Sequence, residues 1–178
     1  MSSVETVTVE SLETQEDPSQ TDTDSSIMDL RMPIYRTSIV HLTLSGINSL
    51  LTLLLLCAKL FTIIFNGVFP SLWYLSFLYT VLRILHICAG ATAYTVKDVS
   101  IDHLKTRVSM ACAVCGISVL FSLGEAIGRG FETNYYMKTN DVLNGVGSGV
   151  QVLLNLGLCI LSAILTVMCA TLTGKLRS

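Results

Sequence analysis

The chain has 178 residues, of which 51% are hydrophobic and only 13% are charged, and its formal net charge is −2. A soluble domain carries about 25% charged residues, so this composition excludes an ordinary soluble protein. A mean hydropathy of +0.64 indicates a membrane protein whose main partner is the lipid bilayer. No nucleic-acid partner is expected.

The acidic residues gather at the start of the chain, where no aromatic residue occurs before Tyr35. Such a polar segment cannot bury enough apolar surface to offset its chain entropy. We therefore expect a disordered tail at residues 1–33 and a helical membrane domain at residues 34–178. The tail lacks the basic start and early apolar stretch of a secretory signal, so the first membrane helix is expected to direct targeting.

Hydroxyl side chains in this tail carry a possible regulatory signal. An acidic residue follows three positions after each of Ser2, Thr14, Ser19, Thr21 and Ser26. This spacing resembles the consensus of acid-directed kinases, and phosphate would make the tail more negative. The same pattern also arises in any solvated segment rich in Ser, Asp and Glu, so both interpretations stay open.

Four apolar segments are long enough to cross a membrane, since a membrane helix needs about 20 mainly apolar residues. They lie at residues 38–64, 73–94, 108–127 and 146–172. The sequence therefore predicts an all-α fold, an integral membrane four-helix bundle with short connections and no second domain. An even number of spans places both termini on one side.

The basic residues predict which side that is. Only Arg129 and Lys138 flank the spans on one side, whereas seven flank them on the other: Arg31, Arg36, Lys97, Lys105, Arg107, Lys175 and Arg177. Lysine and arginine near helix ends favour the cytoplasm. Both termini are therefore predicted to be cytoplasmic.

Arg83 and His86 interrupt the second span, and their spacing of three residues places them on one helical face. An arginine at this depth costs about 2.5–3.5 kcal/mol on insertion scales, so it should face the bundle or a water-filled cavity. One interpretation is a pair of buried groups that fix helix packing or subunit contacts. Another is a proton or ion path, and a third is snorkelling to the interface.

The polar residues of the other spans suggest partners for Arg83. Glu125 lies near the outer end of the third span, about two turns shallower by the 3.6-residue repeat. We therefore expect Arg83 to meet Asn155, Gln151, helix carbonyls or water, and Glu125 to pair with Lys59 near the outer interface. His41 is expected at the cytoplasmic interface.

Two pairs of glycines have the spacing that lets helices approach closely, Gly124 with Gly128 and Gly145 with Gly149. They predict helix packing or oligomerisation. No strand precedes them and no Gly-Lys-Ser/Thr follows, so a phosphate-binding loop is not expected.

The six cysteines all lie in apolar runs, so no disulfide framework is expected. Cys112 and Cys115 form a Cys-x-x-Cys pair without a second half, which favours packing over a metal site. No Ser-His-Asp set or carboxylate pair occurs at a common depth. The sequence therefore predicts a protein that is not an enzyme and has no cofactor or metal.

The layout resembles the membrane-spanning 4-domains subfamily A, the family of the B-lymphocyte tetraspan antigen. The resemblance rests on FPSLWY in the first outer loop and on the run AGATAYTVKDVSIDHLKTRVSMACAVCGISVLFSL. This chain departs from the family pattern at Tyr74-Leu75 and in a short second outer loop without a cysteine pair. The resemblance implies a homo-oligomer at the plasma membrane or in endosomes that modulates receptor and calcium signalling, with a receptor or other membrane protein as partner.

Two other functions stay open. An oligomeric ion channel or transporter would use a polar path through Arg83 and His86, with Lys59 and Glu125 as further members. A structural or trafficking tetraspan would need the same residues only for stability.

Overall fold

The structure is a computed structural model that describes residues 18–67 and 73–177. Within these ranges the chain forms four long helices and one short 3-10 turn, and no strand. Their bounds are α1 Pro18–Asn66, α2 Trp73–Tyr94, η1 Thr95–Lys97, α3 Ile101–Lys138 and α4 Val142–Lys175. The predicted all-α fold is confirmed.

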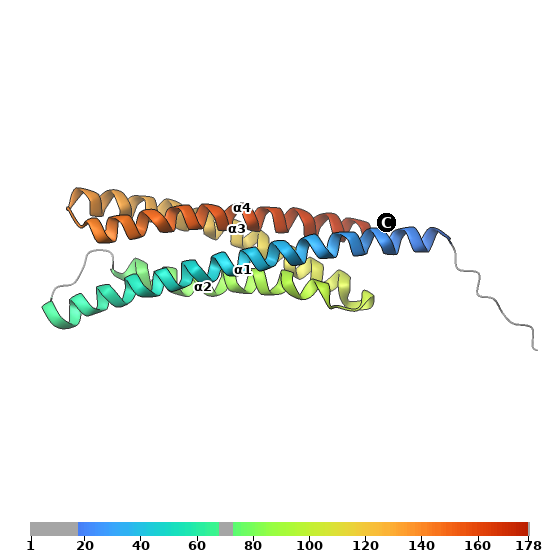
Figure 1. The fold of residues 1–178 in the computed structure, drawn as a ribbon, viewed down its shortest axis with the longest axis horizontal. Coiled ribbons are helices and arrows are strands. Elements are labelled where there is room, and N and C mark those ends of the chain that lie inside the picture. The colour runs from blue at the N-terminus through green and yellow to red at the C-terminus, as the bar shows by residue number, and fades with distance from the viewer. Residues whose placement is uncertain (1–17, 68–72, 178) are drawn as a thin grey trace, which may run out of the picture.

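The four helices run up and down in an elongated bundle (Figure 1). Helix α1 packs against α2 and α4, and α3 packs against α2 and, most extensively, against α4. Helices α2 and α4 face each other diagonally with few contacts. The start of α1 and the end of α4 lie at the same end of the bundle, which we name the terminal end; the connection between α3 and α4 lies at the opposite end, the turn end.

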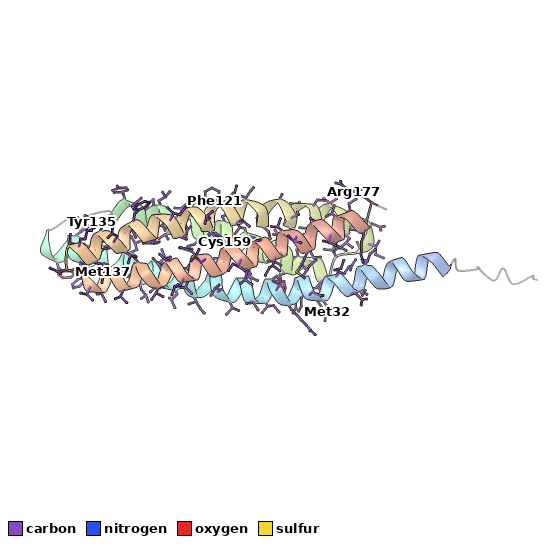
Figure 2. The ribbon with its side chains drawn as sticks, turned by 90° about the horizontal axis from the view of Figure 1, so that it is seen from above. Met32, Phe121, Tyr135, Met137, Cys159 and Arg177 are labelled. Carbon is purple, nitrogen blue, oxygen red and sulfur yellow. The ribbon has the colours of Figure 1, made fainter. Side chains whose placement is uncertain are left out.

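The helices are apolar outside, as a lipid environment requires. Large hydrophobic side chains project outward along the bundle, among them Met32 and Phe121, which are labelled in Figure 2. All four helices are long and apolar enough to cross a membrane. The protein is therefore an integral membrane protein with four spans.

Three helices extend well beyond the apolar segments that predicted them. Helix α3 has 38 residues and α4 has 34. At 1.5 Å per residue they are about 57 and 51 Å long, whereas the hydrocarbon core is about 30 Å thick. The connection expected at residues 128–145 is reduced to residues 139–141, because α3 continues through Lys138.

Helix α1 also begins earlier than expected, since residues 18–33 were assigned to the disordered tail. From Ile27 onward, this early part of α1 has tertiary contacts that composition does not reveal. Ile27 and Ile34 are buried in the apolar cluster of the terminal end. Of the proposed phosphorylation sites, Ser2 and Thr14 lie outside the described residues, and Ser19, Thr21 and Ser26 lie in the first turns of α1.

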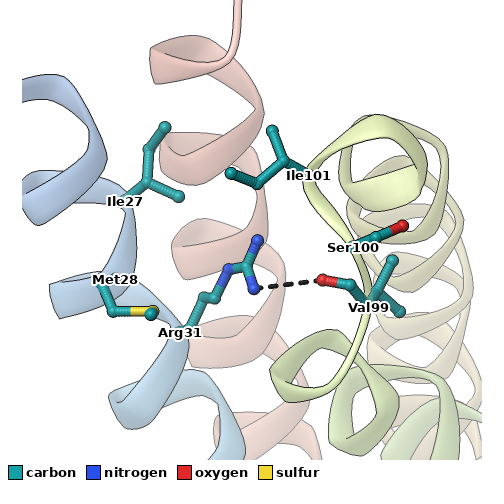
Figure 3. A pocket seen from close by; sticks show the side chains of 6 residues that line it. All are labelled: Ile27, Met28, Arg31, Val99, Ser100 and Ile101. Atoms are coloured by element: carbon teal, nitrogen blue, oxygen red, sulfur yellow. Dashed lines mark hydrogen bonds between the residues drawn. The ribbon is translucent and has the colours of Figure 1, made fainter. Parts of the chain in front are cut away.

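Figure 3 shows how this early part of α1 meets the connection between α2 and α3. The Arg31 Nη1 atom donates a hydrogen bond to the Val99 carbonyl, 3.1 Å away. A cavity of about 250 Å³ lies beside this bond, lined by Ile27, Met28, Arg31, Val99, Ser100 and Ile101. The contact anchors the N-terminal extension of α1 to the rest of the bundle.

The short connection between α3 and α4 contains one residue in the left-handed region of backbone conformation. Asn140 has a φ of 58°, a conformation that asparagine tolerates better than most residues. Next to it, the Asp141 side chain accepts a hydrogen bond from the Asn144 backbone N–H at 3.3 Å and caps α4. The tight turn thus fixes α3 against α4.

Replacing Asn140 tests this turn. Asn140→Val should lower the free energy of unfolding by about 1–3 kcal/mol, because a β-branched residue is strained at positive φ. Asn140→Gly should leave it almost unchanged, since glycine adopts this conformation freely. Thermal unfolding in detergent, followed by circular dichroism, measures both. Equal stability of the two variants would contradict the assigned conformation.

Candidate functional site

The interior of the bundle carries a row of polar side chains on every helix. On α1 they recur every three or four residues, which places them on one face. The buried members are Ser38, His41, Ser45, Asn48, Thr52 and Lys59 on α1; Arg83 and His86 on α2; Ser118, Ser122, Glu125, Arg129 and Glu132 on α3; and Ser148, Gln151, Asn155 and Ser162 on α4. The usual amphipathic pattern is therefore inverted.

Two histidines are joined through two serines, one residue from each helix. His41 Nε2 of α1 lies 2.8 Å from Ser162 Oγ of α4. Ser162 Oγ lies 3.1 Å from Ser118 Oγ of α3, which lies 2.7 Å from His86 Nδ1 of α2. The row crosses the whole bundle.

An ion pair follows directly after His86. His86 Nε2 lies 3.5 Å from Glu125 Oε1, and Glu125 Oε2 lies 2.5 Å from Arg83 Nη2. Arg83 Nη1 donates to the Asn155 side-chain oxygen at 2.8 Å. The Asn48 amide donates to the same oxygen at 2.7 Å.

We name these eight residues the polar chain: His41, Ser162, Ser118, His86, Glu125, Arg83, Asn155 and Asn48. It links all four helices, and on α1 it runs from His41 to Asn48, about two helical turns. Every member is at least 97% buried. Further polar contacts continue from it toward the turn end.

The first of these contacts joins α1 to α4. The Gln151 amide donates to Thr52 Oγ1 at 2.6 Å, and Thr52 Oγ1 donates to the Asn48 carbonyl at 2.8 Å. Closer to the turn end, Glu132 Oε2 accepts from Arg129 Nη1 at 2.6 Å and from Ser148 Oγ at 3.4 Å. Polar groups therefore follow one another along most of the interior.

Two buried basic side chains near the turn end lie beside aromatic rings. The Arg129 guanidinium lies 4.1 Å from the centroid of the Tyr79 ring. Lys59 Nζ lies 5.2 Å from the centroid of the Tyr136 ring. Both geometries allow a cation–π interaction, which is stronger when the cation is shielded from water.

Several buried polar atoms have hydrogen-bonding capacity that the protein does not use. Within the described ranges they include His41 Nδ1, Ser45 Oγ, Asn48 Oδ1, Asn155 Nδ2, Gln151 Oε1, Arg129 Nε and Glu132 Oε1. Buried polar groups generally have a partner, and ordered water supplies it where protein does not. This interior is therefore chemically suited to hydration.

The structure corrects the expected pairing of Glu125. Glu125 contacts Arg83 rather than Lys59, and Lys59 is buried beside the Tyr136 ring. The depth argument was wrong because α3 does not end near residue 127, so Glu125 lies well inside the helix. The expected contact between Arg83 and Asn155 is confirmed.

His41, Arg129 and Glu132 were not recognised as interior residues. His41 is fully buried among the helices. A signal was present in the sequence: on the expected first span, polar residues recur at intervals of three and four between apolar ones. Reading that stripe as an inward face would have identified His41 and Asn48.

The four predicted packing glycines differ in their surroundings. At Gly128 a Cβ atom would collide with the Tyr79 hydroxyl, and at Gly145 it would lie 2.9 Å from Met137 Sδ. At these two positions a side chain would push neighbouring groups apart. A Cβ at Gly149 would make only ordinary contact with Thr133, at 3.7 Å.

Gly124 differs from the other three. A Cβ there would meet no atom within 4 Å. It therefore does not bring two helices of this bundle together.

The cysteine pair contacts two different helices. Cys112 Sγ lies 3.6 Å from the Thr166 carbonyl of α4, and Cys115 Sγ lies 3.6 Å from the Ala89 carbonyl of α2. Among the described residues, no group of three or more His, Cys, Asp or Glu side chains could hold a metal ion. The two thiols pack between helices.

A double-mutant cycle tests the central ion pair. Arg83→Leu or Glu125→Leu alone should lower the free energy of unfolding by about 3–5 kcal/mol, because each leaves a buried charge uncompensated. The double variant should lose much less than the sum, since both charges are gone. Denaturation in mixed micelles measures the three variants. Additive losses would show that the two side chains do not interact.

No family model matches this chain, and neither a curated protein nor a solved structure matches it.

Proposed function

We propose that this protein transfers protons across the membrane through the polar chain and the polar contacts that continue from it toward the turn end. The observation that carries the proposal is the continuous row of short contacts from His41 through Ser162, Ser118 and His86 to Glu125. This corresponds to the transporter alternative of the sequence analysis. The signalling role, the homo-oligomer, the receptor partner and the cytoplasmic orientation of both termini remain predictions.

The chemistry of the row suits proton transfer. A hydroxyl group donates one hydrogen bond and accepts two, and a neutral imidazole donates at one nitrogen and accepts at the other. A proton entering at one histidine can therefore leave at the other after each hydroxyl turns.

Glu125 adds a carboxyl group near the centre of the polar chain. Its carboxylate contacts His86 on one side and Arg83 on the other. The carboxyl group therefore lies between an imidazole that can carry a proton and a guanidinium of fixed charge. Chains of Asp, Glu and His side chains mark proton relays in other membrane proteins.

The cost of burying charge supports transport over packing alone. Five charged side chains of the helices are at least 97% buried: Lys59, Arg83, Glu125, Arg129 and Glu132. Each costs about 2.5–3.5 kcal/mol at the centre of a membrane helix. Apolar residues of similar volume often replace buried ion pairs without loss of stability. Stability alone therefore gives little reason to retain them.

Both ends of the polar region are closed. At the terminal end lies an apolar cluster that includes Ile34, Leu104 and Val108. At the turn end, Lys59 and Tyr136 are each 3% exposed. A gated carrier fits this closure better than an open pore.

Flux measurements test the proposal. Wild-type protein in liposomes should acidify the lumen under a potassium diffusion potential, reported by a pH-sensitive dye. His86→Phe and Ser118→Ala should reduce the rate by about 10²-fold or more, the usual contribution of a positioned proton donor or acceptor. His103→Phe and Ser109→Ala alter exposed residues of α3 and serve as matched controls.

The proposal fails if folded wild-type protein gives no proton flux. It also fails if His86→Phe and His103→Phe give the same rate. Either result would leave the polar chain with a role in packing.

We expect that the protein does not transport metal cations. Three basic side chains, Lys59, Arg83 and Arg129, share the interior of the spans with two carboxylates. This excess of basic groups repels ions of fixed positive charge, whereas a proton can be carried by titration. Sodium and calcium flux in the same liposomes should equal that of empty liposomes. Calcium entry with the wild type would show a cation path instead.

A further inference from the structure

A cavity of about 460 Å³ lies between α2 and α3 and borders the polar chain at Glu125. Its walls are Tyr79, Leu82, Leu120, Phe121, Gly124 and Glu125. Leu120 is 71% exposed and Phe121 is 41% exposed, so the cavity opens on the outer surface of the bundle. Its volume falls in the range of small-molecule sites, about 300–1,000 Å³.

The cavity results from two neighbouring turns of α3. At Gly128 the helix lies against the Tyr79 side chain, with no room for a Cβ atom. One turn earlier, at Gly124, a Cβ atom would meet nothing within 4 Å. The missing side chain at Gly124 therefore leaves space beside Tyr79, whose ring is held in place by Arg129.

The cavity lies within the membrane-spanning part of the protein. Both of its helices are membrane spans, and Leu82 and Gly124 lie far from the helix ends. Water has little access to an outward-facing surface at this depth. Any occupant must therefore come from the hydrocarbon layer of the bilayer.

We infer that this cavity binds a neutral, largely apolar molecule that enters from the bilayer, such as a sterol. Its surface is mostly apolar, and three of its six lining residues are leucine or phenylalanine. Its one acidic residue, Glu125, is already in contact with Arg83 on the inner side. No charge remains to offset a charged head group, whose burial would be costly. This inference does not rest on proton transfer.

Photolabelling tests the inference directly. Full-length protein in nanodiscs would be exposed to diazirine probes on a sterol, a fatty amine and a fatty acid, and labelled peptides would be mapped by mass spectrometry. The sterol probe should label the segment around Leu120 and Phe121 most strongly. Excess unlabelled sterol should compete with it.

Two glycines on α3 provide matched variants. Gly124→Phe fills the cavity and should reduce sterol labelling at least tenfold. Gly130→Phe adds the same side chain at another exposed position where a Cβ meets nothing within 4 Å, and labelling should persist. Gly124→Ala should give an intermediate loss, which shows that the effect follows side-chain volume rather than misfolding.

Three results would overturn the inference. Gly124→Phe could be labelled as strongly as wild type, the amine or acid probe could label this segment in preference to the sterol, or labelling could be even along α3. Because labelling requires no flux assay, absence of proton flux would contradict the proposed function alone.

Discussion

The contact between Arg83 and Glu125 is the interaction on which the rest of the interior depends. Two opposite charges in a medium of low dielectric attract strongly, and separating them there is costly. Their contact fixes the register of α2 against α3. In that register Tyr79 meets Gly128 and Arg129, and His86 meets Ser118. One ion pair thus positions both the polar chain and the cavity beside it.

The bilayer explains why the polarity of the bundle is inverted. Lipid offers no hydrogen bonds, so polar side chains in a span must find partners in the protein or in enclosed water. Asn48, Thr52 and Gln151 do so across the contact between α1 and α4. Apolar residues face outward, where they cost nothing. Hydrogen bonding therefore joins the helices, since lipid is as apolar as leucine and gives no hydrophobic force between them.

Sequence alone predicted the helical class, the four spans and the bounds of α2 at residues 73–94, all of which the structure confirms. It did not predict the length of the other helices. Hydropathy detects the part of a helix that meets lipid, but a helix continues wherever its ends can pack, as α3 does through Lys138. Because hydropathy underestimated the length of α3, the sequence placed Glu125 too close to the helix end and did not predict its contact with Arg83. The contact between Arg83 and Asn155 was predictable because few other acceptors lie at that depth.

The distribution of partners between α1 and α4 has a consequence for synthesis. His41 and Asn48, on the first helix, find their partners Ser162 and Asn155 on the last one. A ribosome completes α4 only after more than 100 further residues. Until then the polar face of α1 has no native partner within the bilayer. Biogenesis therefore requires that the insertion machinery shelter this helix, and release all four helices together.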